Sequence, residues 1–371
     1  MTSRRDFIRK TAMASAGTAA ISFSGMGANP SFSRFGAILQ QVDGKNIRIN
    51  RKMGLGGVAM GNGFHENTIE QITDALTAAW NNGVRYFDTS PWYGLGLSER
   101  RLGHFLFEKK REDFILSTKV GRVLEPDADF TPNPDLLWKG KLNFRHRYDY
   151  TASGVRKSVE DSLQRLGLSS IDVVFVHDLS PDNGDLGSGW IDQFEMARKG
   201  AFPELTKMRE EGIIKAWGMG VNTPQPILNC LEVADPDVML VAIQYSLVEH
   251  QNALNEVFPA MEKRNVKAII GGPLNAGFLA NRDRFNYGGE MPVEMLQKRV
   301  ELNRIVKKYQ LDLGTVALQF CAAHPTVAAV IPGASSATQV VANSLSANVK
   351  VPADLWVELK EAKLIDANAP V

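Results

Sequence analysis

The sequence predicts an α/β protein built as a single (β/α)8 barrel of the TIM type, with an N-terminal β-hairpin and extra helices at the C-terminal end. Short apolar runs alternate with segments of helical apolar spacing, in about eight pairs. The alternation continues in one uninterrupted series, which fits a closed barrel better than an open sheet. No GxGxxG motif follows the first strand with an acidic residue about 20 positions later, so the dinucleotide fingerprint of open sheets is missing.

The predicted strands are short, apolar and often β-branched, as expected of strands buried in a parallel sheet. The run from Ile171 to Val176 shows this pattern most clearly. The predicted strands cover residues 47–53, 84–87, 114–118, 171–176, 213–220, 238–243, 266–270 and 327–331.

The predicted helices lie between these strands. In the first, Ile72, Leu76 and Ala79 recur at helical spacing, and Gly83 follows as a stop signal. The predicted helices cover 68–81, a segment opening at Ser98, 151–166, 202–211, 224–233, 254–263, 293–309, 313–323, 336–345 and 352–363. Two polar insertions, 122–150 and 281–292, lengthen connections within the series without breaking the alternation.

Composition narrows the classes of partner. The chain has 42 basic and 41 acidic residues, without a basic stripe interleaved with aromatics, so we expect no nucleic-acid partner. The two cysteines, Cys230 and Cys321, lie in apolar helical patterns. We expect them to be small core residues, with a disulfide or a reactive thiol as the alternative.

The first 45 residues differ from the rest. A basic start is followed by an Ala-rich stretch that is too short to span a bilayer stably, so no membrane span is expected. The pair Arg4-Arg5, with Asp-Phe-Ile-Arg-Lys after it, resembles a twin-arginine (Tat) export signal. We therefore expect residues 1–45 to be a Tat signal peptide and disordered linker, cleaved near Ala28 or Ala37, and residues 46–371 to form the barrel.

Export by the Tat machinery would make the protein periplasmic. The alternative is a charged, disordered tail in which two arginines happen to adjoin, on a protein that stays cytoplasmic.

Chemically active residue types stand at the ends of three consecutive predicted strands. Asp88 ends one strand and Tyr93 follows five residues later, Lys119 ends the next, and His177 ends the third. Barrel enzymes carry their chemistry at the carboxyl ends of strands. Each residue alone could be a turn cap or a solvated charge, but their joint placement predicts an active site.

The residues around these positions resemble the aldo-keto reductase signature, and the resemblance covers about residues 48–360. It is carried by 85–90, 93–94 and 98–103, by Lys119 and His177, and by 331–335. The runs 161–167, 270–275 and 285–287 further resemble the branch of aldose and pyridoxal dehydrogenases. The resemblance implies an NAD(P)-dependent oxidoreductase that moves hydride between nicotinamide and an aldehyde, ketone or sugar hemiacetal.

The resemblance also implies roles for the four residues. Tyr93 would be the general acid in reduction and the base in oxidation, with a contribution of about 10²–10⁴-fold in rate. A free phenol has a pKa of about 10, which the Lys119 ammonium would lower. Asp88 would keep Lys119 charged, and His177 would orient the substrate oxygen. No metal is implied, and the five other histidines do not pair with a second ligand at metal spacing.

By the same resemblance, the cofactor would lie across the carboxyl ends of the strands. Asn222 would bind the carboxamide and Tyr245 would stack on the nicotinamide. Backbone at Gly272, Leu274 and Ala276 would approach the pyrophosphate. The remaining expected contacts, toward the adenosine end, are Gly333, Ser335, Gln339 and Asn343.

Two departures from the family pattern bear on the cofactor. Ser335 and Ser336 stand where many members carry a cation for the 2′-phosphate of NADP, so NAD is favoured over NADP. Ala242 stands where the usual carboxamide-binding glutamine would be. Gln244 either takes over that contact or packs in the core.

The substrate is poorly specified. Both insertions should wall the pocket, and Trp92, Trp138, Arg145 and Tyr287 are the expected lining residues, unless they only pack or face solvent. A small carbonyl compound or sugar is the expected substrate.

The alternative function is a cofactor-binding redox sensor with little turnover, which the four intact residues argue against. A metal-dependent barrel hydrolase would need clustered metal ligands at strand ends, which are absent from the sequence.

Overall fold

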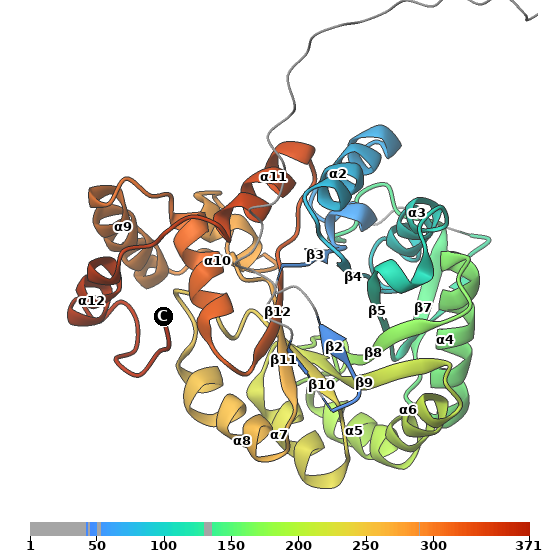
Figure 1. Ribbon diagram of the computed structural model, residues 1–371. Coiled ribbons are helices and arrows are strands. Elements are labelled where there is room, and N and C mark those ends of the chain that lie inside the picture. Colours follow the sequence, from blue (N-terminus) through green and yellow to red (C-terminus); the bar gives the residue numbers. More distant parts are fainter. Residues whose placement is uncertain (1–41, 44, 50–52, 130–135, 289) are drawn as a thin grey trace, which may run out of the picture. The chain divides into compact units, whose positions relative to one another are not determined.

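A computed structural model describes residues 42–43, 45–49, 53–129, 136–288 and 290–371. Within these residues, eight parallel strands form a ring with helices outside it (Figure 1). In spatial order they are β12 (Val327–Ile331), β11 (Lys267–Gly271), β10 (Val238–Ala242), β9 (Ile214–Val221), β8 (Ile171–His177), β5 (Ile115–Val120), β4 (Tyr86–Asp88) and β3 (Leu55–Gly56). The expected (β/α)8 barrel is therefore confirmed.

The ring closes where β3 meets β12. The Gly54 N–H donates to Val330 O at 2.9 Å, and the Gly56 N–H donates to Pro332 O at 3.1 Å. A side chain at Gly56 would place its Cβ 2.9 Å from the carbonyl oxygen of Ile331. Glycine is required here because the two backbones approach so closely.

Helices follow the strands, largely as periodicity predicts. The first, α2 (Ile69–Asn81), begins with a capping box in which Thr68 and Gln71 exchange hydrogen bonds. The other helices are α3 (Leu97–Leu106), α4 (Ala152–Leu166), α5 (Trp190–Lys199), α6 (Ala201–Glu210), α7 (Pro224–Val233), α8 (Phe258–Lys263), α9 (Val293–Lys308), α10 (Leu313–Ala323), α11 (Ala337–Ser346) and α12 (Ala353–Glu361).

Two apolar layers stabilise the barrel. The larger lies between strands and helices, and includes Cys230 and Cys321, both fully buried as expected. The smaller fills the barrel interior. It includes Ile49, from the short antiparallel hairpin of β1 (Val42–Asp43) and β2 (Arg48–Ile49), so the expected N-terminal hairpin contributes to the core.

The structure corrects four expectations about elements. Residues 122–150, expected only as a polar insertion, contain an antiparallel hairpin of β6 (Arg122–Pro126) with β7 (Phe144–Tyr148). Helix α5 has no predicted counterpart. The first barrel strand is Leu55–Gly56, not 47–53, and the helix expected at 254–263 begins as a π-helical turn at Ala253–Val257.

Two of these differences, the hairpin and α5, concern elements with few buried side chains. Strand β7 alternates charged and aromatic side chains that are exposed or only half-buried, and α5 fully buries only Phe194 and Ala197. Weak burial leaves a weak apolar pattern on which to base a prediction.

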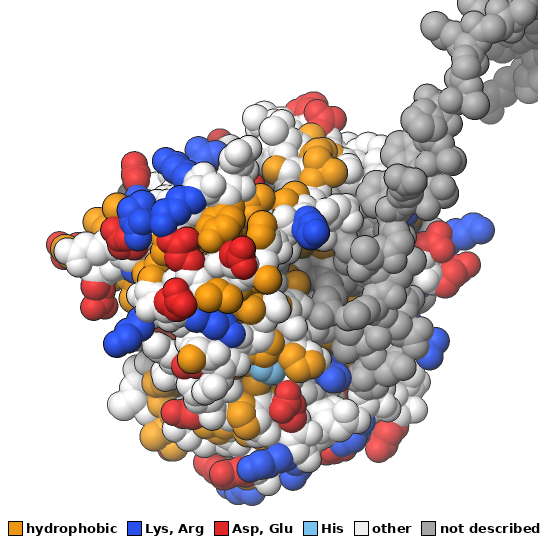
Figure 2. All heavy atoms as spheres, turned by 60° about the vertical axis from the view of Figure 1, so that its left-hand side comes forward, with side chains coloured by type: hydrophobic (Ala, Val, Ile, Leu, Met, Phe, Trp, Pro, Cys, Tyr) orange, Lys and Arg blue, Asp and Glu red, His pale blue; other side chains and the backbone are white. Residues whose placement is uncertain are grey.

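The surface carries both signs of charge. Figure 2 shows acidic and basic side chains interspersed over one face, with apolar side chains between them. In the part of the chain that the structure describes, no helix is both long and apolar enough to cross a membrane. The expected signal peptide, with its arginine pair and the cleavage candidates Ala28 and Ala37, lies outside the described residues.

Candidate functional site

A cavity of about 1120 Å³ opens at the carboxyl ends of the strands. Its volume exceeds the roughly 300–1,000 Å³ usual for small-molecule sites. The four residues predicted to be catalytic, Asp88, Tyr93, Lys119 and His177, all line it. They come from the ends of β4, β5 and β8 and from the turn after β4, so the barrel brings together residues spread over 90 positions of the chain.

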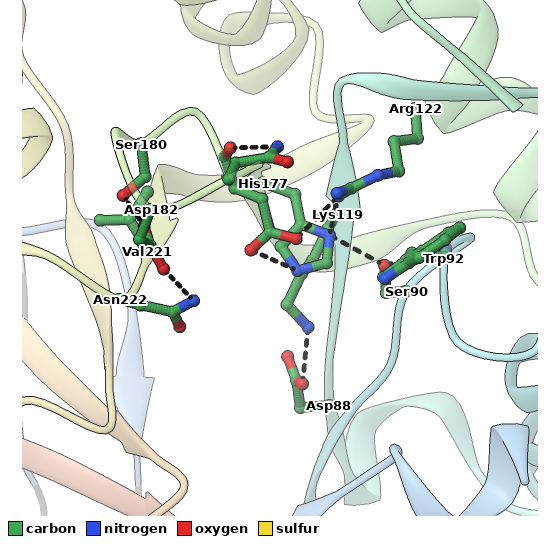
Figure 3. A network of polar contacts seen from close by, with 12 residues as sticks. Asp88, Ser90, Trp92, Lys119, Arg122, His177, Ser180, Asp182, Val221 and Asn222 are labelled. Carbon is green, nitrogen blue, oxygen red and sulfur yellow. Dashed lines mark hydrogen bonds and ion pairs between the residues drawn. The ribbon is translucent and has the colours of Figure 1, made fainter. Parts of the chain in front are cut away.

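Asp88 and Lys119 form a buried ion pair. Lys119 Nζ donates to Asp88 Oδ2 at 2.7 Å and to Thr89 O at 2.8 Å, and the Ser117 hydroxyl donates to Asp88 Oδ1 at 2.7 Å. The two charged side chains are only 1% and 2% exposed. Figure 3 shows the lysine pointing toward the carboxylate. Such buried charges persist only when paired and hydrogen-bonded, so the pair fixes the lysine in position.

The Lys119 ammonium lies over the face of the Tyr93 ring, 4.5 Å from its centroid. Desolvation, and after it the negative charges of Asp88 and Asp178, raise the pKa of the Tyr93 phenol well above its usual value. Arg122 opposes this shift only in part. Lys119 was expected to lower this pKa, but burial and the two carboxylates outweigh any such effect, and the net shift is upward. The phenol keeps its proton at neutral pH.

His177 is neutral, and its tautomer follows from its neighbours. Burial, and then the charges of Lys119 and Arg122, lower its pKa well below the usual value. Arg122 Nη1 lies 3.5 Å from His177 Nδ1, and the Ser90 hydroxyl lies 3.2 Å from it. Because a guanidinium can only donate, Nδ1 acts as acceptor and the proton is assigned to Nε2. His177 can therefore donate a hydrogen bond to a substrate oxygen.

Arg122 is a site residue that sequence reasoning missed. Its side chain is 5% exposed, donates to Asp178 Oδ2 at 2.8 Å and to Tyr148 Oη at 2.9 Å, and lies over the rings of Trp92 and Tyr148. Its only signal was its position three residues after Lys119, at the start of a polar insertion that was expected to wall the pocket. Asp178 was also missed, although it directly follows His177 and lines the cavity.

Most of the expected cofactor contacts also line the cavity. These residues are Asn222, Gly272, Leu274, Ala276, Gly333, Ser335, Gln339 and Asn343. Asn222 Nδ2 donates to Asp182 Oδ2 at 2.9 Å (Figure 3). The Gln339 side-chain oxygen Oε1 accepts the Ser335 N–H at 2.8 Å, so this side chain organises the loop before α11.

Tyr245 and Gln244 lie outside the cavity lining, which contradicts their expected cofactor contacts. The Tyr245 ring is fully buried and stacks on Phe320, with 5.2 Å between centroids. Gln244 Nε2 donates to Val221 O at 2.9 Å and joins neighbouring strands. The reason is local: Ile243 has a left-handed φ of 53° and itself lines the cavity, and the two following side chains turn into the core.

Of the four expected substrate residues, Tyr287 alone lines the cavity, with 44% of the residue exposed. Trp138 is 3% exposed and packs against the Tyr93 ring, with 5.4 Å between the ring centroids, so it helps to fix the phenol in position. Trp92 packs edge-on against Trp138. Arg145 is 66% exposed and pairs with Glu125 on the hairpin. No pattern in the sequence could show whether the Arg145 side chain, on a hairpin strand, faces the cavity or the solvent.

The lining fits a dinucleotide. Asn275, Ala276 and Gly277 are three successive left-handed residues, with φ of 47°, 58° and 99°. The turn is closed by two backbone hydrogen bonds, from the Asn275 N–H to Gly272 O at 2.9 Å and from the Gly277 N–H to Leu274 O at 3.0 Å. Arg282 and Arg284, which sequence reasoning also missed, line the same part of the cavity and suit a diphosphate. Among the described residues, no group of three His, Cys, Asp or Glu side chains is arranged to hold a metal ion.

Comparison with known proteins agrees with this geometry. The aldo/keto reductase family matches residues 52–363. D-threo-aldose 1-dehydrogenase of Pseudomonas sp is 36% identical over 321 residues, covering 84% of this chain and 94% of the relative. Pyridoxal 4-dehydrogenase of Microbacterium luteolum is 35% identical over 329 residues, with the same coverage. A solved aldo-keto reductase from Bacillus halodurans, in its holo form, shares the fold with a TM-score of 0.66 at 24% identity, over 89% of this chain and 98% of its own.

Proposed function

The chain belongs to the aldo/keto reductase family and is an oxidoreductase, and from this we propose that it interconverts a small carbonyl compound or sugar hemiacetal with its alcohol or lactone counterpart. The observation that carries the proposal is the convergence of the Tyr93 phenol, the neutral His177 imidazole and the buried Asp88–Lys119 pair on one cavity. Members of this family use nicotinamide cofactors.

The chain's own residues would move the proton. A nicotinamide bound in the cavity supplies the hydride in reduction and accepts it in oxidation. In reduction, Tyr93 hands its proton to the carbonyl oxygen, and its raised pKa ensures that the proton is present at neutral pH. His177 donates a hydrogen bond from Nε2 to the same oxygen and holds it in place. The Lys119 charge over the ring stabilises the phenolate that remains. In oxidation the same groups act in reverse.

We propose NAD rather than NADP as the cofactor. The cavity lining contributed by residues 331–349 contains no charged side chain. Ser335 and Ser336 occupy the place where a cation would bind the 2′-phosphate, and Ser336 instead caps α11 by accepting the Gln339 N–H at 3.3 Å. Without a cation, the extra phosphate of NADP would lose its solvation without gaining a partner.

The substrate class follows from the relatives and from the lining. Two relatives are named for action on D-threo-aldose and on pyridoxal, both small and polar. The cavity around Tyr93 offers polar edges at His177 and Asp178 and the aromatic ring of Tyr287. We therefore propose a sugar hemiacetal or similar hydroxylated carbonyl compound.

We also propose export through the Tat machinery to the periplasm, on the Arg4-Arg5 motif alone. Fractionation of cells expressing the full chain tests this. The wild-type protein should be periplasmic and an Arg4→Lys/Arg5→Lys variant cytoplasmic. Equal cytoplasmic location of both proteins would refute export.

Turnover and cofactor binding test the activity. Purified full chain should bind NAD(H), detected by quenching of its tryptophan fluorescence, and oxidise aldoses from a panel. A protein that binds neither dinucleotide would overturn the proposed function. A protein that binds one but turns over no carbonyl or sugar would instead favour a redox sensor.

A further inference from the structure

Asp178, the residue after His177, is held in an unusual backbone conformation. Its φ is 47°, in the left-handed region that residues with a side chain rarely adopt. Its N–H donates to Gly220 O at 3.0 Å, and its carbonyl oxygen accepts from Asn183 Nδ2 at 2.9 Å. Strained residues that the surroundings fix in this way cluster at functional sites. These two hydrogen bonds fix the backbone of Asp178, so its side chain is held at the cavity.

The two oxygens of the Asp178 carboxylate have different surroundings. Oδ2 accepts from Arg122 Nη1 at 2.8 Å, and Arg122 is itself fixed between the rings of Trp92 and Tyr148. Oδ1 lies 3.4 Å from His177 Nε2, which is longer than an ordinary N–H···O hydrogen bond. Within the described part of the chain, no hydrogen bond to Oδ1 is found. One oxygen is anchored, and the other retains its capacity to accept.

The position of Oδ1 determines what it can accept. It lies beside the imidazole nitrogen that would hold the reacting oxygen, so its nearest substrate atoms belong to the reacting carbon and the carbon next to it. A carboxylate only accepts hydrogen bonds, so a favourable substrate group there must be a donor. A substrate hydroxyl at this position can donate to Oδ1, whereas a hydrogen atom in its place makes no hydrogen bond. A substrate carboxylate there would be repelled by the Asp178 charge.

We propose that Asp178 is a specificity-determining residue that accepts a hydrogen bond from a substrate hydroxyl adjacent to the reacting carbon. The site then selects neutral hydroxylated aldehydes and sugar hemiacetals over unsubstituted aldehydes and 2-oxo acids. Arg122 is the positioning residue that aims the carboxylate. This inference rests on the proposed function, because it concerns the substrate of the same site.

Two substrates that differ by one hydroxyl test the proposal. Lactaldehyde carries the adjacent hydroxyl and propanal lacks it. The wild-type full chain should prefer lactaldehyde by about 10–100-fold in kcat/KM, the range expected for a hydrogen bond to a charged group. The Asp178→Asn variant should lose most of that ratio, because its kcat/KM for lactaldehyde falls much more than its kcat/KM for propanal.

Matched variants separate specificity from structural damage. Asp192→Asn removes an exposed acid from the first turn of α5, outside the cavity lining, and should leave the ratio unchanged. Arg122→Lys should reduce the ratio in the same sense but by less, because it loosens the carboxylate without removing it. Neutralising Asp178 also relieves the raised pKa of Tyr93, but this acts on both substrates alike and cancels in the ratio.

The outcomes are distinct. A lactaldehyde preference that Asp178→Asn abolishes supports the proposal. A wild-type ratio near one, or an unchanged ratio in Asp178→Asn, overturns it. If that variant does not fold, as judged by circular dichroism, the wild-type ratio and Arg122→Lys decide in its place. If the wild-type protein turns over neither these aldehydes nor any sugar, the proposed function fails instead.

Discussion

The two halves of the cavity are built differently. On the side of β4, β5 and β8, the lining carries ionised side chains whose partners are fixed at 2.7–2.8 Å, as in the Lys119–Asp88 and Arg122–Asp178 pairs. On the side of β12 and α11, residues 331–349 contribute only backbone and neutral side chains. The first half can stabilise developing charge and move a proton. The second half can hold a large ligand without adding charged groups that would perturb the charge developing at the reacting atoms.

This contrast predicts that substitutions on the charged side change catalysis and stability strongly, whereas substitutions on the neutral side change cofactor preference.

The largest effect should follow from Tyr93→Phe, which removes the proton donor and leaves the ring packed against Trp138. We expect kcat to fall about 10²–10⁴-fold, with little change in KM or melting temperature. Tyr309→Phe, on the outer helices with its hydroxyl on Glu358, is the control and should keep full activity. If Tyr93→Phe turned over substrate as fast as wild type, the phenol would not be the proton donor. The assignment of catalysis to the charged side of the cavity would then fail.

Lys119→Met should damage stability as well as rate. It leaves the Asp88 carboxylate buried without its cation, which costs about 3–5 kcal/mol in unfolding free energy. The double variant Lys119→Met/Asp88→Asn should recover much of this stability but not the activity. Chemical denaturation gives both values. A single variant as stable as wild type would show that the pair is not the buried charge centre that the geometry indicates.

On the neutral side, Ser335→Arg should create a contact for the 2′-phosphate. We expect affinity for NADP to rise by about tenfold, from a charge-assisted hydrogen bond, while affinity for NAD changes little. Fluorescence titration with both dinucleotides measures this. An equal gain for both dinucleotides would place the adenosine end elsewhere.

The smallest effect concerns pH. His177 has a lowered pKa in the folded protein, so below about pH 6.5 the unfolded state takes up a proton that the folded state does not. Above that pH, the burial of neutral His177 does not make the free energy of unfolding depend on pH. Below it, the free energy of unfolding decreases by up to about 1.4 kcal/mol per pH unit. Unfolding free energies at pH 7 and 5.5 should fall less in His177→Asn than in wild type. Equal falls would mean that His177 protonates freely in the folded protein.

The sequence by itself determined the barrel and part of the charged half of the site. Apolar periodicity located α7, α10 and β12 at their observed bounds, because burial on one face imposes that periodicity. Asp88, Lys119 and His177 could be selected because their residue types stand at strand ends, and the barrel topology brings strand ends together.

Only the tertiary structure decided how these groups are connected. It placed Arg122 against Asp178, 56 positions away, and pointed Lys119 at the face of the Tyr93 ring. The left-handed turn at Ile243 sent Tyr245 into the core instead of the cavity. Periodicity records which residues are buried, but the partner of a buried charge and the direction of a side chain after an irregular turn depend on distances between segments far apart in the chain. Residue type and position therefore predicted Asp88, Lys119 and His177 on the charged side and the contacts at 333–343 on the neutral side, which all line the cavity. The ion pair of Arg122 and the direction of Tyr245 were visible only in the tertiary structure.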